Sequence, residues 1–194
     1  MMRKAMLCAT VLTMAAGSVA AQDAGWAGYY GGVMGATHKG GQDYEGGSSS
    51  YDLEGPAFGI FAGHLWESGT LVYGAEVAAG RGGVYEVSED GETSYKDDYE
   101  YNRFLDVKAR AGYALNNVLL YGTIGLSRAS FLSNETTTDS TGLILGVGAD
   151  YKVNDRFFLG AEILRRNYDF YDNGQDVDID ASFNSLGLRA GIRF

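Results

Sequence analysis

Histidine, serine and carboxylate side chains are the residues of this sequence that could carry out acyl transfer, and histidine is the scarcest of them. The chain has two histidines, His38 and His64. A serine nucleophile needs an imidazole base within hydrogen-bond reach and a third group that orients the base. His64 is followed by Leu65 and Trp66, so the sequence shows no such arrangement. We expect no catalytic residue and interpret His64 as a packed or lumen histidine.

Acidic residues gather in two segments that could attract a divalent cation, residues 86–100 and 169–180. Carboxylates are ligands that Ca²⁺ and Mg²⁺ prefer, but neither segment matches the twelve-residue calcium loop. Weak cation association through these segments is therefore a hypothesis, and the alternative is a solvated, repulsive surface. We expect no metal site and no cofactor.

A third group of charged residues alternates with apolar residues along the chain. In residues 103–113, Leu105 and Val107 fall on one face, and Asp106, Lys108 and Arg110 fall on the other. This period of two indicates a strand whose two faces differ chemically. A helix would spread the same charges around its circumference.

Across the predicted strands this pattern places four carboxylates and four cations opposite the aliphatic residues. They are Glu76, Asp106, Asp150 and Glu162, and Lys108, Arg110, Arg189 and Arg193. Their formal charges sum to zero, and glycines lie among them. Buried charges must be paired, so a balanced set fits the narrow lumen of a barrel. The alternative is the solvated outer face of a soluble, lipocalin-like carrier.

Eight segments have the composition or the alternation of strands. They are residues 26–37, 57–66, 71–80, 103–113, 118–131, 141–151, 157–163 and 186–194. In 26–37, 57–66 and 118–131 the sequence leaves open which face points outward.

The links between these segments alternate between short and long. Residues 67–70, 115–117 and 152–155 are tight turns, whereas the links near 38–55, 81–100, 132–140 and 169–178 are long and polar. Such alternation is typical of membrane barrels, whose two rims face different compartments. The sequence therefore predicts an all-β fold, an eight-stranded antiparallel up-and-down transmembrane β-barrel.

The N-terminus has the pattern of a cleavable signal peptide over residues 1–21, which leaves one barrel domain over 22–194. Arg3 and Lys4 precede a short apolar stretch, and small residues follow it. We place the cut after Ala21, with Ala20 as the alternative site and a retained anchor as the alternative interpretation. Cleavage would remove the single cysteine, Cys8.

The charge balance excludes nucleic acid as a partner. The chain carries 15 basic and 25 acidic residues, and loss of Arg3 and Lys4 leaves 13 against 25, a net charge of −12. Nucleic acid binding requires a basic face.

The last strand ends on an aromatic residue, with apolar residues at every second position before it, including Leu188, Ile192 and Phe194. This terminal pattern resembles the signal by which the outer-membrane assembly machinery recognises its substrates. Other aromatic residues near predicted strand ends fit interfacial girdles, although tyrosine also favours strands in general. They are Tyr29, Tyr30, Tyr73, Tyr113, Tyr121 and Tyr151.

Several motifs make the chain similar to the small porin-like outer-membrane β-barrel proteins of α-proteobacteria, the Omp25/Omp31 and RopB type. The motifs are Trp26-Ala-Gly-Tyr-Tyr-Gly-Gly32, Asp106 to Tyr113, Leu119 to Leu126, Gly146 to Tyr151, Gly160 to Leu164 with Tyr168-Asp-Phe170, and Gly187 to Phe194. The resemblance implies the cell outer membrane as location, with lipid, lipopolysaccharide and the assembly machinery as partners.

The leading functional hypothesis is structural: envelope integrity and surface display, without enzymatic activity. The alternative is adhesion or host interaction through extracellular loops, with 38–55 and 81–100 as the candidate contact segments. A narrow pore ranks lower, because eight strands leave an interior that side chains fill. A lipid-modifying barrel enzyme also ranks lower.

Overall fold

The computed structural model describes residues 25–44, 50–82, 86–89, 92–93, 99–133, 136–172 and 177–194. Within these residues, no helix is long and apolar enough to cross a membrane. The predicted signal peptide, with its cleavage after Ala21, lies outside the described residues and stays a prediction.

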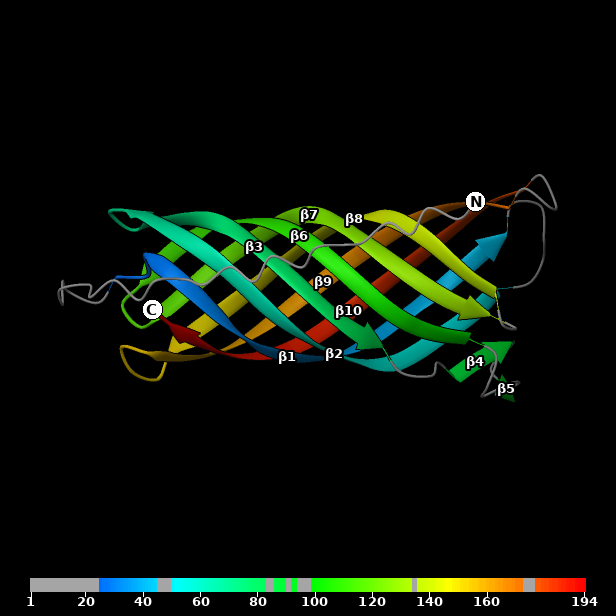
Figure 1. Cartoon of the computed structure of the whole chain (residues 1–194), viewed down its shortest axis with the longest axis horizontal. Helices are drawn as coiled ribbons and strands as arrows, with labels where there is room; N and C mark the ends of the chain where they lie inside the picture. The colour runs from blue at the N-terminus through cyan, green and yellow to red at the C-terminus, as the bar shows by residue number, and fades with distance from the viewer. Residues whose placement is uncertain are drawn as a thin grey trace, which may run out of the picture.

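Eight long strands in the described part of the chain form one closed antiparallel barrel (Figure 1). They are β1 (Gly28–Tyr44), β2 (Ser50–Ser68), β3 (Leu71–Gly82), β6 (Tyr99–Leu115), β7 (Val118–Ser133), β8 (Thr136–Lys152), β9 (Phe157–Asp172) and β10 (Val177–Arg193). Each pairs with the next along the chain, and β1 also pairs with β10, which closes the sheet. The predicted fold class is confirmed.

Three tight turns lie together at one end of the barrel, next to the C-terminus (Figure 1). They follow β2, β6 and β8, as the sequence predicts. Gly69 and Asn116 take left-handed backbone conformations in two of them, with φ of 63° and 54°. Glycine and asparagine tolerate this region best. By the rule that short turns face the periplasm, the other end of the barrel is extracellular.

The strand register fixes the tilt of the strands. Following the pairing once around the barrel from Lys39 leads to Tyr29, a shift of 39 − 29 = 10 residues. For eight strands this shear corresponds to a tilt of about 40°. At this tilt and a rise of about 3.3 Å per residue, about ten residues of each strand are enough to cross about 25 Å, the height of the apolar band of such barrels.

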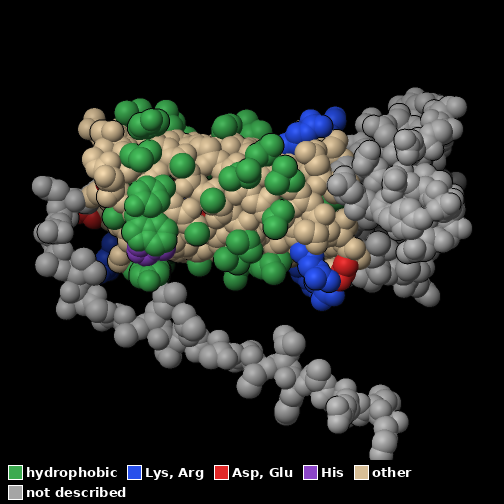
Figure 2. Space-filling view, turned by 90° about the horizontal axis from the view of Figure 1, so that it is seen from above, with side chains coloured by type: hydrophobic (Ala, Val, Ile, Leu, Met, Phe, Trp, Pro, Cys, Tyr) green, Lys and Arg blue, Asp and Glu red, His purple; other side chains and the backbone are tan. Residues whose placement is uncertain are grey.

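The two faces of the wall are chemically opposite. Val107 and Leu188 are 54% and 69% exposed, whereas Lys108 is 1% exposed and Arg189 is 5% exposed. Aliphatic side chains therefore point away from the barrel, and ionised ones point into it. Figure 2 shows hydrophobic side chains spread over one side of the wall, with Lys and Arg side chains near its two ends.

The register also settles the three strands whose facing the sequence leaves open. In β1 and β2, Tyr30 and Phe61 point inward and are buried, whereas Val33 and Ile60 point outward and are exposed. In β7 the same alternation buries Tyr121 and leaves its neighbour Leu120 exposed on the wall.

The strands are longer than the sequence predicts at the extracellular end. β1 extends to Tyr44, β2 begins at Ser50, and the predicted loop 81–100 contains the short strands β4 (Glu86–Glu89) and β5 (Glu92–Thr93). β4 pairs with residues 51–54 of β2. These segments contain polar residues at successive positions, so they lack the alternation that marks a strand, although their backbones still pair.

Glycines on the inner face make room for large side chains. A Cβ atom added at Gly148 would collide with the ring of Tyr121, and one added at Gly160 would collide with the carboxylate of Asp150. Eight strands enclose an interior just wide enough for side chains. The inner glycines therefore allow an interior that contains long charged and aromatic residues.

Candidate functional site

The centre of the barrel holds a carboxylate that is paired with three cations. Glu76, on β3, is 1% exposed. Its oxygens lie 2.9 Å from Nζ of Lys108, 3.1 Å from Nη1 of Arg110 and 2.5 Å from Nη2 of Arg189. A buried carboxylate loses its hydration and requires such partners.

Two further carboxylates complete this group, which we name the lower cluster: Glu76, Lys108, Arg110, Asp150, Glu162 and Arg189. Lys108 Nζ lies 2.9 Å from Glu162, and Arg110 Nη2 donates a 2.6 Å hydrogen bond to Asp150. The hydroxyl of Tyr30 donates to Glu76 at 2.9 Å and accepts from Arg110 at 3.0 Å. Three carboxylates and three cations give the lower cluster no net charge.

Aromatic rings line the space around the cations of the lower cluster. The guanidinium carbon of Arg110 lies 3.7 Å from the ring centroid of Tyr121, and that of Arg189 lies 3.9 Å from the ring centroid of Phe61. These distances fit cation–π contacts, which are strongest where water is excluded. The interior is therefore both charged and tightly packed.

A second polar group lies closer to the extracellular end, and we name it the upper cluster: Asp106, Arg166, Ser127, Ser185, Tyr168 and His38. Arg166 donates a 2.7 Å hydrogen bond to Asp106 and a 2.6 Å hydrogen bond to Ser185. Ser127 donates to the other oxygen of Asp106 at 2.6 Å. The charges of one carboxylate and one guanidinium cancel, so the upper cluster also has no net charge from these two groups.

His38 belongs to the upper cluster, where its Nδ1 lies 2.8 Å from Oγ of Ser185. The Ser185 oxygen also accepts a hydrogen bond from Arg166. Within the described residues, the cavity that Ser185 lines is too small for a substrate, so we interpret this serine as a structural partner of the Arg166 guanidinium. The cavity between β1, β9 and β10 at this point has a volume of about 10 Å³, room for about one water molecule.

Seven of the eight residues predicted for the lumen charge network lie buried inside the barrel. They are Glu76, Asp106, Lys108, Arg110, Asp150, Glu162 and Arg189. Arg193 does not join them. Its guanidinium lies at the periplasmic rim, where it donates to the backbone carbonyls of Gly25 and Ala27.

Arg166, which the sequence analysis did not include, is the fourth buried cation of this network instead of Arg193. With Arg166, four cations balance the four carboxylates of the network. The alternation on β9 could have revealed it, because Arg166 follows Glu162 by four positions on the same face. The error at Arg193 arises because this residue is the last of β10, where the strand leaves the lumen.

The chain segment that precedes β1 covers the periplasmic end of the barrel. Trp26 is 2% exposed, and its backbone N–H donates a 2.5 Å hydrogen bond to Glu67. The ammonium of Lys152 lies 4.8 Å from the Trp26 ring centroid, and the guanidinium of Arg193 lies 5.7 Å from it. The indole and its two cations thus close this rim.

His64 points outward into the periplasmic aromatic girdle. Its ring centroid lies 4.4 Å from that of Tyr29 and 4.5 Å from that of Trp66, which stacks on Tyr73 at 5.9 Å. His64 is therefore a packed histidine on the outer wall, and not a lumen residue.

At the extracellular edge of the apolar band the outward side chains become charged. This cationic collar consists of Lys39, Arg81, Arg103, Arg128 and Arg165, all exposed. Within the collar, the Ser130 hydroxyl and the Arg128 guanidinium donate hydrogen bonds to Asp139 and lower the pKa of its carboxyl. The side chains of residues 86–100 and 169–180 lie outside the described part, so the cation hypothesis for them is untested.

A closed barrel with an apolar outer band, a charged interior and an aromatic girdle defines an integral protein of the bacterial outer membrane. The chain belongs to the family described as outer membrane protein beta-barrel domain, which matches residues 9–194.

Two relatives are also outer-membrane proteins, which supports the family assignment. The chain is 30% identical over 180 residues to a 22 kDa outer membrane protein of Rhizobium leguminosarum bv. viciae, covering 87% of this chain and 78% of the relative. It is 29% identical over 187 residues to the 31 kDa outer-membrane immunogenic protein of Brucella melitensis biotype 1, covering 79% and 72%. The predicted resemblance to the α-proteobacterial type is confirmed.

Solved structures show the same fold at low sequence identity. The outer membrane protein AlkL is 12% identical with a TM-score of 0.52, covering 92% of this chain and 96% of that one. OprG of Pseudomonas aeruginosa is 14% identical with a TM-score of 0.51, covering 87% and 96%.

Proposed function

We propose that this protein is a non-enzymatic structural barrel that supports outer-membrane integrity and displays its extracellular segments at the cell surface. The observation that carries the proposal is the lower cluster, whose paired charges cross the interior of the barrel from β3 to β9. A solute that entered would have to separate buried ion pairs, and breaking one such pair costs about 3–5 kcal/mol. The interior therefore supports a mechanical role over a transport role.

The burial of the one serine–histidine pair described in the interior argues in the same direction. Ser185 Oγ lies 2.8 Å from Nδ1 of His38 and also accepts a hydrogen bond from Arg166. Acyl transfer needs such a serine and base to face a substrate, whereas Ser185 and His38 are only 3% and 2% exposed.

Surface display is supported by the length of the strands. A tilted strand crosses a bilayer in about 9–11 residues, whereas β1, β6, β8 and β10 each have 17 residues. The excess lies beyond the cationic collar, so the barrel projects its extracellular links away from the lipid. The Brucella relative is named an immunogenic protein, and a surface-projecting barrel fits that name.

Assembly is the remaining part of this proposal. Leu188, Ile192 and Phe194 lie on the outer wall of β10 and at its end, with exposures of 69%, 40% and 73%. Phe194 N–H donates a 2.9 Å hydrogen bond to the carbonyl of Tyr29, next to the seam where β10 meets β1. An exposed apolar strand at the closing seam is accessible to the outer-membrane assembly machinery before closure.

Deletion and complementation test the structural role. A deletion strain should take up a hydrophobic dye faster and become sensitive to bile salts, and the wild-type gene should restore the barrier. A variant in which residues 86–98 are replaced by a short glycine–serine linker should also restore it, because the barrel remains whole. If only the full-length extracellular segment restores the barrier, or if deletion leaves the barrier unchanged, the structural role is wrong.

The adhesin alternative rests on the same projecting end of the barrel. Its test is binding of whole cells to host cells or matrix, with the same linker variant. A loss of binding without loss of barrier would assign adhesion to residues 86–98.

A further inference from the structure

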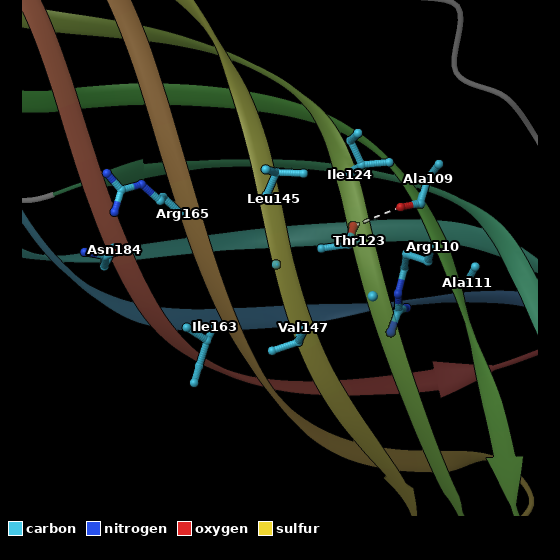
Figure 3. Close-up of a pocket in the computed structure, with 12 residues that line it drawn as sticks. Ala109, Arg110, Ala111, Thr123, Ile124, Leu145, Val147, Ile163, Arg165 and Asn184 are labelled. Carbon is cyan, nitrogen blue, oxygen red and sulfur yellow. Dashed lines mark hydrogen bonds between the residues drawn. The ribbon is translucent and has the colours of Figure 1, made fainter.

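The outer wall carries a continuous depression over strands β6 to β10. Two adjoining hollows, each of about 600 Å³, share the lining residues Ala111, Gly122, Val147 and Ile163. Both lie on the face that points away from the lumen. Figure 3 shows the hollow that Arg165 and Asn184 line from neighbouring strands. The same hollow is lined by Ile163, Val147, Leu145 and Ile124. We name the whole depression the wall groove.

Small side chains form the floor of the wall groove. The outward positions of one register row are Ala111 and Gly122, and those of the next row are Ala149 and Ala161. Large residues stand at other outward positions, such as Leu188, which pairs in register with Ala161, and Phe58 on β2; they are 69% and 67% exposed. The groove is therefore a local lack of side-chain volume next to large apolar groups such as Leu120 and Leu188.

A cation stands at the extracellular end of the wall groove. Arg165 is exposed, pairs in register with Leu145 and Asn184, and donates a 3.2 Å hydrogen bond from Nε to Asn167. Among the described carboxylates, Glu54 pairs with Lys39 and Asp139 pairs with Arg128, whereas none pairs with Arg165. A long arginine side chain in the apolar band extends its guanidinium to the lipid headgroup level.

We propose that the wall groove is a binding site for one phosphorylated lipid of the outer leaflet, a lipid A moiety of lipopolysaccharide. One acyl chain lies along the floor of Ala111, Gly122, Ala149 and Ala161, and a phosphate pairs with Arg165. The apolar floor and the Arg165 cation match the acyl chain and the phosphate of this lipid in chemistry and in position across the membrane. The apolar floor lies inside the band, and the guanidinium lies at its extracellular edge, where the phosphates of the outer leaflet are.

A second copy of the chain fits the groove less well. Two-fold contacts place the same surface of both copies together. Two copies joined at the groove would bring their Arg165 side chains close to each other at the edge of the low-dielectric lipid, where like charges repel. A lipid phosphate instead neutralises this charge. The inference goes beyond the structural role and does not depend on it, since a lipid site is compatible with any function of the barrel.

Substitutions at two positions test the site without altering the interior. Gly122 is suited to filling the groove, because a Cβ there meets only the carbonyls of Gly146 and Ala111, at 3.9 and 4.0 Å. Gly122→Leu should therefore fold, and its side chain should occupy the floor. Gly35→Leu is the matched control, an outward glycine on β1 whose Cβ would lie 3.6 Å from Phe58. Arg165→Gln removes the cation, and Arg81→Gln is its control on the collar.

The measurement is native mass spectrometry of the refolded full-length barrel domain, released from detergent micelles that contain purified lipid A. Heat-modifiable gel migration verifies that each variant is folded. Wild-type protein should retain one lipid A molecule, with affinity reduced about tenfold in Gly122→Leu and in Arg165→Gln. The two controls should bind like the wild type. Dephosphorylated lipid A should bind wild type and Arg165→Gln equally.

Two results would overturn the site. In the first, Gly122→Leu and Arg165→Gln retain lipid A like their controls, which would mean only non-specific annular lipid. In the second, wild-type protein is dimeric without lipid and Gly122→Leu is monomeric, which would assign the groove to a second copy of the chain. Neither result bears on the barrier assay, so the site and the structural role can fail separately.

Discussion

Arg165 and Arg166 are consecutive residues of β9 whose guanidinium groups lie on opposite sides of the barrel wall. Arg166 is 1% exposed and pairs with Asp106 at 2.7 Å, whereas Arg165 is exposed at the edge of the apolar band. The period of two in a strand makes this separation unavoidable. One arginine therefore serves the interior and the other serves the lipid surface.

Substitution of each arginine compares how the inner and outer faces of the wall contribute to the free energy of unfolding. Arg166→Ala leaves Asp106 as an uncompensated buried charge, which should lower the free energy of unfolding by about 3–5 kcal/mol. Arg165→Ala should change it by less than about 0.5 kcal/mol, as at other surface positions. The measurement is urea unfolding in phosphatidylcholine vesicles without lipopolysaccharide. Equal effects of the two substitutions would contradict the assignment of faces.

The lower cluster should show strong coupling between its charges. Glu76→Gln removes the carboxylate charge that three cations share, so it should destabilise the barrel by about 3–5 kcal/mol. Adding Lys108→Met restores the charge balance, and the double variant should be more stable than the sum of the single effects by about 1–3 kcal/mol. The same unfolding assay measures both. Additive effects would mean that the cluster does not act as a unit.

Inner and outer glycines should differ in their tolerance of a methyl group. Gly148→Ala places a Cβ against the ring of Tyr121, and this overpacking should cost about 1–3 kcal/mol. Gly122→Ala places a Cβ on the outer wall at an ordinary contact distance, 3.9 Å, from its nearest neighbour and should be tolerated. The fraction that folds into vesicles, followed by heat-modifiable migration, compares the two. If Gly148→Ala folds to a larger fraction than Gly122→Ala, the packing of Tyr121 against Gly148 is wrong.

The carboxyl of Asp139 should titrate below its ordinary range. The hydrogen bonds from Ser130 and Arg128 favour its charged form, so its pKa lies below the usual 3.8. The stabilisation is complete above the unfolded-state pKa and is lost as the pH falls through the lower folded-state value. Ser130→Ala should raise the pKa toward 3.8, and carboxyl NMR of protein labelled at aspartate measures it. An unchanged Asp139 pKa in this variant would exclude the hydroxyl as the cause.

Much of the barrel could be predicted because the membrane imposes a strict alternation on every strand that crosses it. Val107 and Lys108 show this most clearly, since adjacent residues of opposite character must face lipid and lumen. The alternation fails beyond the collar, where water lies outside the wall. Residues 39–44 and 50–54 therefore look like loop in the sequence, although their backbones pair.

The remaining errors come from places where a strand ends. Arg193 keeps the inward alternation of β10, but the segment around Trp26 crosses the rim and offers backbone carbonyls to it. This path depends on tertiary packing that no local pattern encodes. Whether His64 faced lipid or lumen could not be predicted either, because histidine is compatible with both faces and β2 carries few charges to fix its register.

Planar-bilayer recording tests most directly the central claim that paired charges close the interior. Purified full-length barrel domain, inserted at neutral pH with gel-verified folding, should give no steady ionic current at up to about 100 mV, because ion entry requires separation of pairs around Glu76. Steady single-channel openings in the wild-type protein, unaltered by Glu76→Gln, would contradict the claim.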